Sequence, residues 1–480
     1  MDTLDTTGAQ PGATVFVLFG ATGDLAKRMV LPAFYQLELA GLLPQDWRLV
    51  GNGRGDVSHL DFRQYVHDAL GEFGDAPDPD KWEKFAGNLY FAGGGFASDD
   101  PGSMLDVLER AKQSVGQDAQ FVHYLAVPPS AFEPLTEALG QHRLTENARV
   151  VYEKPFGTSP DGFRSLDDAV HRVLDESQVY RIDHFLGKEA TQDLHVLRFA
   201  NKLFEASWSN EHVKAVQIDV PETLDIADRA GFYDATGALL DMVVTHLFQV
   251  AAEVAMEPPA SLHPDDLQAA RESVIAAFRP IDPTEVVYGQ YDGYRATDGI
   301  ADDSTTETFV AARLWVDTDR WRGVPFLLRT GKQLADSQQV VSLLFRDPVG
   351  PLKELPHNGN VLQFSLKGSG TVRVRMVVKE PGVSMEFGVS DADIDLATVR
   401  NGHPVPPYAR LIHDVLLGDR SLFTRPDGLQ EVWDVAGPLL DHQPGVLPYP
   451  AGSWGPTEAN ALAAPDGWLL GTSDEPAADR

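Results

Sequence analysis

The chain has 480 residues, including 42 Gly, 33 Pro and no Cys, and 43% of its residues are hydrophobic. This composition excludes a disordered or collagen-like chain, and the lack of cysteine excludes disulfides, thiolate nucleophiles, zinc–thiolate sites and iron–sulfur clusters. Lys and Arg number 39 against 71 Asp and Glu, for a formal net charge of -32. Nucleic acid and anionic membranes are therefore not expected partners, and an anionic ligand needs a local pocket of Lys, Arg and His.

The first 180 or so residues alternate between predicted strands and helices. Short apolar runs at 14–20, 47–51, 121–127 and 148–152 are typical of buried parallel strands. Helical patterns follow the first run, to about residue 39, and occupy about 131–139. This alternation predicts a doubly wound α/β sheet, a Rossmann-like dinucleotide-binding domain, over residues 13–185.

Beyond residue 210, strand-like runs follow one another with few helices between them. The predicted strands are 213–220, 308–316, 340–345, 361–366 and 371–378, and predicted helices at 408–417 and 429–433 come after them. This order predicts an α+β domain with a large, mainly antiparallel sheet over residues 186–470.

The sequence contains no pattern of a secreted or membrane protein. The N-terminal segment MDTLDTTGAQPGA lacks the basic and apolar regions of a signal peptide. The most apolar long stretch, 238–256, carries Asp241, His246, Gln249 and Glu253, which a bilayer would not tolerate. We expect a soluble, cytoplasmic protein that does not enter the membrane.

A glycine-containing turn follows the first predicted strand and opens a helix. Small residues there let the backbone approach a pyrophosphate, and the helix N-terminus offers N–H groups and a positive dipole end. An ordinary glycine strand-to-helix turn is the alternative. The candidate cofactor-binding residues of this turn are Gly20, Ala21, Thr22, Gly23, Asp24 and Leu25. Arg54, after the second strand, suits a 2′-phosphate and so favours NADP, with NAD left open as a weaker or dual cofactor.

Taken with further motifs, this turn makes the chain resemble the glucose-6-phosphate dehydrogenase family. The motifs, in the family's order, are EKPFG at 153–157, RIDHFLGK at 181–188, LRFAN at 197–201, STT at 304–306, RW with GVPF between 320 and 326, R with GK between 329 and 332, and GPTEA at 455–459. They span nearly the whole chain. The resemblance implies oxidation of D-glucose 6-phosphate at C1 to 6-phospho-D-glucono-1,5-lactone by NADP, in the oxidative branch of the pentose phosphate pathway. It also implies a C-terminal domain that binds substrate and forms a homodimer or homotetramer.

The resemblance implies a catalytic dyad of His246 and Asp183. Removing hydride from a sugar C1 requires a base for the hydroxyl proton, and an imidazole backed by a carboxylate suits this step. Only the resemblance pairs these two residues, which are far apart in sequence. Without it, His246 on an apolar helix would be interpreted as a core histidine.

The resemblance assigns His184 and Lys188 to the sugar phosphate, and Lys154 to a position between sugar and nicotinamide. Because His184 and Lys188 are four residues apart, they would share one face of a helix and could both bind a phosphate. A capping His beside a solvated Lys is the alternative. Lys154 precedes Pro155, a rigid or cis linkage, and its motif also occurs in other Rossmann sugar dehydrogenases.

Glu222, Asp241 and Lys332 match positions that bind sugar hydroxyls in similar enzymes. Carboxylates suit this role because each accepts several hydrogen bonds from a polyol. Asp241 precedes His246 by five residues, about 140° around an α-helix, so the two would border a cleft. A surface carboxylate is the alternative for Glu222.

The chain departs from the family's common pattern at several positions. Phe185 and Phe132 stand where many members have Tyr, Val244-Thr245 replaces a Gln-Asn pair, and Ser337 replaces a basic residue. These departures leave open a related C1 dehydrogenase of another 6-substituted or free aldose. A non-catalytic nucleotide-binding relative is the alternative of a different class. We expect no metal site and no second structural NADP site around 338–342.

Overall fold

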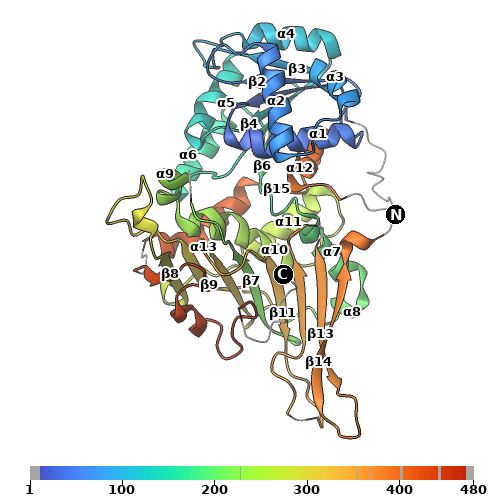
Figure 1. Ribbon diagram of the computed structural model, residues 1–480, viewed down its shortest axis with the longest axis vertical. Helices are drawn as coiled ribbons and strands as arrows, with labels where there is room; N and C mark the ends of the chain where they lie inside the picture. Colours follow the sequence, from blue (N-terminus) through green and yellow to red (C-terminus); the bar gives the residue numbers. More distant parts are fainter. Residues whose placement is uncertain are drawn as a thin grey trace. The chain divides into compact units, whose positions relative to one another are not determined.

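The computed structural model describes residues 11–226, 229–352, 354–368, 370–399, 404–441 and 445–471. The first ten residues, on which the prediction of no signal peptide mainly depends, lie outside the described residues. The described chain forms two compact units, shown in Figure 1. Unit 1 comprises the described residues up to Gly187 together with Pro259–Ala269 and Val405–Asp427. Unit 2 comprises those of Lys188–Pro258 and Ala270–Pro404 and those from Gly428 onward.

Unit 1 is built on a seven-stranded sheet of order β15-β6-β5-β4-β1-β2-β3. Its strands are β1 (Thr14–Phe19), β2 (Trp47–Asn52), β3 (Leu89–Ala92), β4 (Gln120–Leu125), β5 (Ala148–Tyr152), β6 (Val179–Ile182) and β15 (Phe423–Thr424). Neighbours among β1 to β6 pair in parallel, whereas β15 pairs with β6 antiparallel. This confirms the predicted doubly wound sheet, which has the classical order with one added edge strand.

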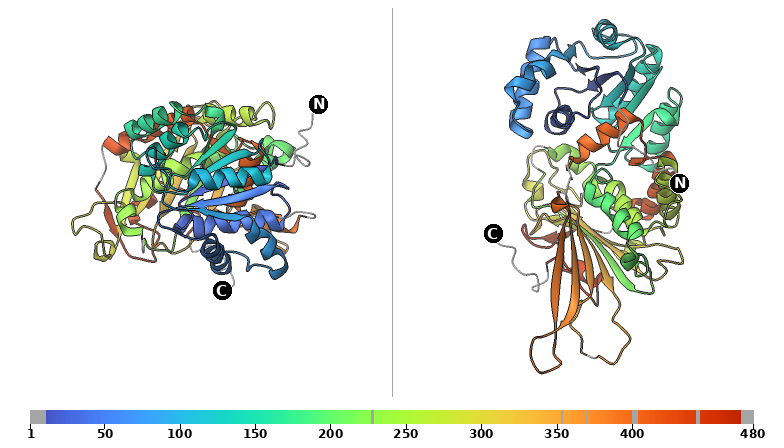
Figure 2. Two further views of the ribbon diagram at one scale, coloured as in Figure 1. Left: turned by 90° about the horizontal axis from the view of Figure 1, so that it is seen from above. Right: turned by 90° about the vertical axis from the view of Figure 1, so that its right-hand side faces the viewer.

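Helices cover both faces of this sheet, as the right-hand view of Figure 2 shows. They are η2 (Ala26–Val30, a π-helix), α1 (Leu31–Leu39), α2 (His59–Phe73), α3 (Pro79–Gly87), α4 (Met104–Val115), η3 (Pro129–Ala131), α5 (Phe132–Gln141), α6 (Pro160–His171), η4 (Glu176–Gln178) and α12 (Pro407–Leu417). Because both faces are covered, every residue of β1 is buried, which explains its continuous apolar run. The late helix α12 packs on α1, where Leu411 and Ile412 join the core of unit 1.

Unit 2 is built on a nine-stranded sheet of order β14-β13-β12-β11-β7-β10-β9-β8-β16. Its strands are β7 (Val213–Pro221), β8 (Val286–Tyr291), β9 (Phe309–Trp315), β10 (Pro325–Gly331), β11 (Val340–Phe345), β12 (Val361–Ser365), β13 (Thr371–Lys379), β14 (Phe387–Asp395) and β16 (Leu447–Tyr449). Only the β7–β10 and β8–β16 pairs are parallel among these described strands. The predicted, mainly antiparallel sheet is therefore confirmed.

Helices of unit 2 pack against one face of this sheet, η6 on β9 and β10 and α7 on β12. The helices are α7 (Glu189–Ala200), α8 (Lys202–Glu205), α9 (Ala230–Asp234), η6 (Leu239–Leu247, a π-helix), α10 (Phe248–Ala255), α11 (Pro264–Ile275, whose first residues are counted with unit 1), η7 (Pro283–Glu285), η8 (Tyr294–Ala296), η9 (Leu396–Thr398), α13 (Pro426–Asp441) and η10 (Thr457–Ala461). The sheet thereby holds η6, which carries Asp241 and His246.

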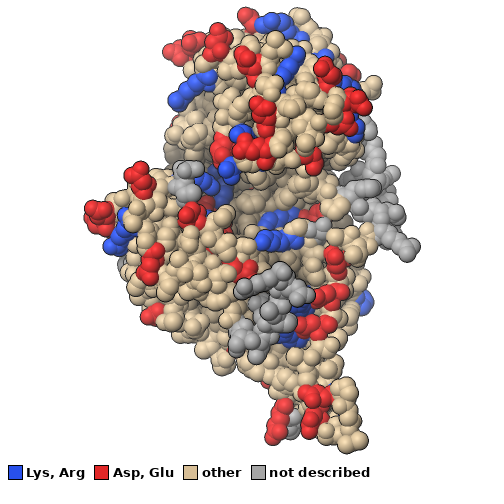
Figure 3. All heavy atoms as spheres, viewed as in Figure 1, with Lys and Arg blue, Asp and Glu red and all other residues tan. Residues whose placement is uncertain are grey.

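No helix in the described residues is both long and apolar enough to span a bilayer. The stretch at 238–256 instead forms η6 and α10, and Asp241, His246, Gln249 and Glu253 are all buried within the protein. Acidic side chains are spread over both units on the face drawn in Figure 3, in keeping with the net charge of -32.

Candidate functional site

The glycine turn of unit 1 lies where β1 and β4 part, at the point where the strand order reverses. Gly20 has a φ of +73°, and a Cβ added there would lie 2.2 Å from the carbonyl oxygen of Ala126, directly after β4. A Cβ at Gly23 would meet the oxygen of Gly20 at 3.1 Å. The helix begins at Asp24. The turn thus lacks side chains at Gly20 and Gly23 next to a helix N-terminus, and it fits a dinucleotide pyrophosphate at the usual position of this fold.

The end of β2 is connected to this turn. The N–H of Ala21 donates to the carbonyl of Asn52 at 3.0 Å, and a Cβ at Gly53 would lie 3.4 Å from Thr22 Oγ1. Arg54, the next residue, is exposed. Arg54 thus directly follows the glycine that lies next to the turn, and its side chain is open to solvent.

Lys154 follows β5 and comes directly after Glu153, a buried acid that the sequence analysis gave no role. Glu153 accepts a hydrogen bond of 2.5 Å from the hydroxyl of Tyr124 and another from Tyr408. Burial raises the pKa of Glu153 to about 7, against the opposing effect of these hydrogen bonds and of the Lys154 charge. Lys154 is half-buried, and its bond to Pro155 is cis. The sequence could have indicated Glu153, because it is the first residue of the EKPFG motif and directly follows a buried strand.

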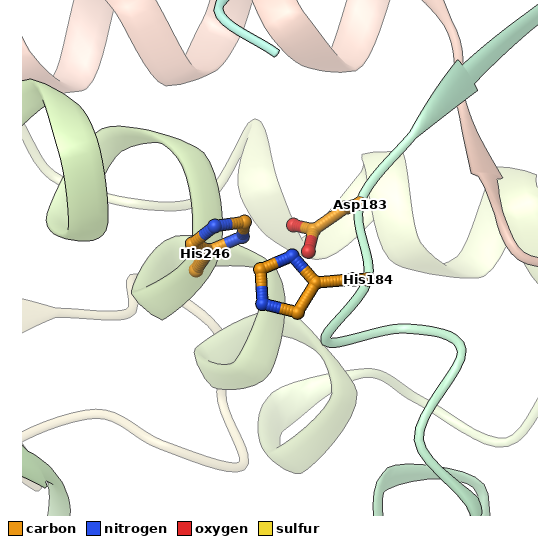
Figure 4. A group of neighbouring side chains, drawn as sticks. All are labelled: Asp183, His184 and His246. Atoms are coloured by element: carbon orange, nitrogen blue, oxygen red, sulfur yellow. The ribbon is translucent and has the colours of Figure 1, made fainter. Parts of the chain in front are cut away.

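Asp183 and His184 follow β6 in unit 1 and are drawn in Figure 4. Asp183 is buried, and its Oδ1 accepts a hydrogen bond of 2.8 Å from the N–H of Phe185. The ring of His184 stacks on Tyr408, with centroids 6.2 Å apart. An oxygen of Asp183 and a ring nitrogen of His184 lie within 4.8 Å of each other. The segment therefore presents a fixed carboxylate beside an imidazole.

The helix assumed for His184 and Lys188 is wrong. Residues 184–187 form a turn, and Lys188 is the N-cap residue of α7 in unit 2. The shared face that four-residue spacing gives on a helix does not apply here. The ammonium group of Lys188 donates to Gln339 Oε1.

The spacing argument for Asp241 and His246 also needs correction. Both lie on η6, and Figure 4 shows His246 on this helix. η6 is a π-helix, and at its C-terminal end the N–H of Phe248 donates to Val243 O. Because a π-helix repeats its hydrogen bonds at i→i+5, residues five apart lie nearly above one another. Asp241 and His246 are therefore on the same face of η6 and do not diverge by the angle of an α-helix. Both side chains are buried.

Glu222 and Lys332 form an ion pair in unit 2. They directly follow β7 and β10, which are parallel neighbours with Gly331 opposite Pro221, so the two strand ends meet at one edge. The N–H of Glu222 donates to Gly331 O at 2.9 Å, which fixes this edge. The sequence could not show the pairing, because the parallel contact joins residues 110 positions apart.

Asp241 lies near this ion pair, as its charge and that of Glu222 both act on the hydroxyl of Tyr233. The ammonium group of Lys332 lies over the Tyr233 ring, 5.5 Å from the ring centroid. Glu307 accepts a hydrogen bond of 2.9 Å from the N–H of Leu239, the first residue of η6. Unit 2 thus gathers three carboxyl groups and an ammonium group around one phenol, and the sequence reasoning missed both Tyr233 and Glu307.

The positions that depart from the family pattern have ordinary contacts. Phe132 is fully buried against Tyr152, and Phe185 is buried beside His184. Ser337 accepts a hydrogen bond of 2.9 Å from the ammonium group of Lys367. The ammonium group of Lys367, in the loop after β12, therefore lies next to Ser337, the position where many family members have a basic residue.

The fold and the turn at the β1–β4 junction define unit 1 as a dinucleotide-binding unit of the doubly wound class. Two family models match the chain in succession. "Glucose-6-phosphate dehydrogenase, NAD binding domain" matches residues 17–193, and "Glucose-6-phosphate dehydrogenase, C-terminal domain" matches residues 195–469.

Relatives and solved structures are similar over nearly the whole chain. Glucose-6-phosphate 1-dehydrogenase 2 of Mycobacterium tuberculosis is 39% identical over 93% of this chain and 92% of its own length. The Rhizobium meliloti glucose-6-phosphate 1-dehydrogenase is 34% identical, with 94% and 96% covered. A crystal structure from Mycobacterium avium has a TM-score of 0.83 at 35% identity, with 95% of this chain and 98% of that chain covered. A glucose-6-phosphate dehydrogenase in complex with glucose-6-phosphate has a TM-score of 0.89 at 29% identity, with 97% and 100% covered. The chain belongs to the glucose-6-phosphate dehydrogenase family.

Proposed function

We propose that the chain oxidises D-glucose 6-phosphate at C1 to 6-phospho-D-glucono-1,5-lactone, with NADP as hydride acceptor, as the first oxidation of the pentose phosphate pathway. The observation that carries this proposal is the match of both domains of one enzyme family, in order, over residues 17–193 and 195–469. Two features support the proposal: the close backbone approach at Gly20 suits a pyrophosphate, and the carboxylates of unit 2 suit a polyol.

In this reaction His246 takes the proton of the C1 hydroxyl as the C1–H bond breaks and the C1–O double bond forms. NADP, when bound, accepts the hydride at the nicotinamide C4. Asp183 orients the imidazole and stabilises its protonated form. The hydrogen bond from Phe185 N–H to Asp183 Oδ1 supports this role, because it fixes the carboxylate in one orientation. Asp183 belongs to unit 1 and His246 to unit 2.

Sugar binding is assigned to six side chains. His184 and Lys188 bind the phosphate, Glu222 and Asp241 accept hydrogen bonds from sugar hydroxyls, and Lys332 orients these carboxylates and donates to the sugar. Lys154 lies between sugar and nicotinamide. The Glu222–Lys332 ion pair supports the assignment, since each partner keeps hydrogen-bonding capacity for a polyol.

NADP is preferred to NAD because Arg54 can pair with the 2′-phosphate. The exposure of Arg54 at the residue after Gly53, which lies against Thr22, supports this assignment. Replacing Arg54 by Ala should reduce kcat/KM for NADP by about 10- to 100-fold and leave that for NAD nearly unchanged. An equal loss with both cofactors would contradict the assignment.

Initial rates of NADPH formation with glucose 6-phosphate and with free glucose test the substrate. We expect a large preference for the phosphorylated sugar. Equal kcat/KM values would instead favour the free-aldose alternative that Phe185 and Ser337 suggested. Replacing His246 by Asn should lower kcat by about 100-fold or more and leave NADP affinity unchanged. Unchanged turnover would reject the base assignment and support a base elsewhere.

We also propose that residues 13–185 form the NADP-binding domain, to which the structure adds 259–269 and 405–427, and that the rest of 186–470 forms the substrate domain of a homodimer or homotetramer. The edge strand β14 and its neighbour β13 support a dimer, because they expose Met376, Val378, Val389 and Ile394 at the edge of the large sheet. Light scattering of the wild type and a Val389→Asp variant tests the assembly. We further place the enzyme in the cytoplasm, which cell fractionation with an activity assay tests.

A further inference from the structure

Tyr233 carries a buried hydroxyl group that no described residue satisfies. The side chain lies on α9 and is only 4% exposed. Among the residues that the structure describes, none forms a hydrogen bond with its Oη. Because a buried hydroxyl without a partner is costly, such a group in a binding region indicates a missing ligand atom.

The helix that carries Tyr233 is held firmly by its last residue. Asp234 Oδ1 accepts hydrogen bonds from Tyr294 at 2.9 Å and from Ser304 at 2.5 Å, and its carbonyl accepts one of 2.7 Å from Thr306. Ser304 and Thr306 belong to the STT motif, which the proposed reaction leaves without a role. These contacts anchor α9, so the backbone from which Tyr233 extends is held in place before any ligand binds.

The surroundings of Tyr233 are those assigned to sugar hydroxyls. The ammonium group of Lys332, paired with Glu222, lies 5.5 Å from the centroid of the Tyr233 ring. Burial raises the pKa of Tyr233 well above its usual value, and the carboxylates of Asp241, Glu307 and Glu222 raise it further. The phenol therefore stays protonated at neutral pH and is available as a hydrogen-bond donor.

We infer that Tyr233 is a further substrate-binding residue, whose Oη donates a hydrogen bond to one ring hydroxyl oxygen of the bound sugar. This inference rests on the proposed function, because it takes Glu222, Asp241 and Lys332 as the sugar-binding group. It adds a neutral hydroxyl donor to a group in which Glu222 and Asp241 can only accept hydrogen bonds and Lys332 donates as a cation. One sugar oxygen is thereby recognised as an acceptor while its neighbours act as donors.

The test is a Tyr233→Phe variant, with Tyr288→Phe as the matched control. Tyr288 lies in the same unit, is equally buried and also has a hydroxyl without a partner among the described residues. Its pKa is raised by burial and by Glu307, with no contribution from Glu222 or Asp241. Loss of the Tyr233 hydroxyl should reduce kcat/KM for glucose 6-phosphate by about 3- to 10-fold, with KM for NADP and the thermal midpoint unchanged. The control should leave all these quantities unchanged.

Deoxy analogues identify the contacted oxygen. Glucose 6-phosphates lacking the hydroxyl at C2, C3 or C4 are assayed with the wild type and with Tyr233→Phe. For the analogue that lacks the contacted hydroxyl, kcat/KM should be the same in Tyr233→Phe and in the wild type, because the hydrogen bond is already absent. An equal loss for every substrate, an equal loss in Tyr288→Phe, or no loss at all would overturn the inference.

Failure of the proposed function would look different. If the wild type oxidised free glucose as well as the phosphate ester, the phosphate assignment would fail, and the same variants would be compared on glucose and its deoxy forms. If His246→Asn kept its turnover, the base assignment would fail while the kcat/KM ratios still measured the Tyr233 contact.

Discussion

Replacing Glu307 by Gln tests how a buried carboxyl group at the start of η6 affects stability. Glu307 is 5% exposed and accepts a hydrogen bond from Leu239 N–H, while its own carbonyl accepts one of 3.0 Å from Ala238 N–H. Burial raises its pKa from the ordinary 4.5 to about 7. A Gln side chain keeps an acceptor oxygen for Leu239 and removes only the ionisation, so the variant isolates the cost of the charge.

The raised pKa fixes the sign and size of the effect. Because the folded state binds the Glu307 proton more tightly than the unfolded chain, its stabilising contribution is complete below about pH 4.5 and is lost as the pH rises through about 7. The shift corresponds to about 3 kcal/mol of unfolding free energy lost by about pH 8. Glu307→Gln should therefore gain about 3 kcal/mol relative to the wild type between about pH 4 and pH 8.

Urea unfolding followed by tryptophan fluorescence measures this difference, because most of the tryptophans belong to unit 2. Glu458→Gln, at an exposed glutamate of the same unit, serves as the control and should follow the wild type. A stability difference between Glu307→Gln and the wild type that stays constant over the pH range would refute the reasoning.

Three further predictions follow from single contacts. Gly20→Ala should raise KM for NADP by about 10-fold or more and lower the thermal midpoint, because the added Cβ would lie 2.2 Å from Ala126 O at a positive φ. Lys367→Ala should raise KM for glucose 6-phosphate by several-fold and leave KM for free glucose unchanged, because its ammonium group donates to Ser337, where many family members have a basic residue; an equal change in both KM values would show that Lys367 does not act on the phosphate. Asp219→Ala should cost about 3–5 kcal/mol in urea unfolding, because it leaves the buried Arg329 guanidinium without its partner.

Strands whose burial dictates their composition could be predicted from the sequence. The mainly apolar runs of β1, β4 and β5 reflect a sheet covered on both faces. By contrast, β3 and β6 have four residues each, too few for a clear pattern. The edge strand β14 is acidic and exposed, and its pairing with β13 depends on ion pairs such as Arg373–Asp393 and Arg375–Asp391. No hydrophobic pattern could reveal it.

The candidate site was predictable only where a motif is local. The turn from Gly20 to Leu25 is contiguous, and its place after β1 is what the apolar run and the glycines predicted. The Glu222–Lys332 ion pair depends on which strands become neighbours, and that information is tertiary. The alignment of Asp241 with His246 depends on a π-helix, whose extra residue per turn has no signature in composition.

Two buried acids affect how the pH dependence of turnover must be interpreted. Glu153 precedes Lys154, and Glu307 caps the helix that carries His246, so each supports an element of the proposed chemistry without being assigned a substrate contact. Burial raises the pKa of both carboxyl groups to about 7, where an imidazole also titrates. Protonation of either acid changes the electrostatics around its element near pH 7. An ionisation in the pH profile of kcat can therefore be assigned to His246 only if it persists in both Glu153→Gln and Glu307→Gln.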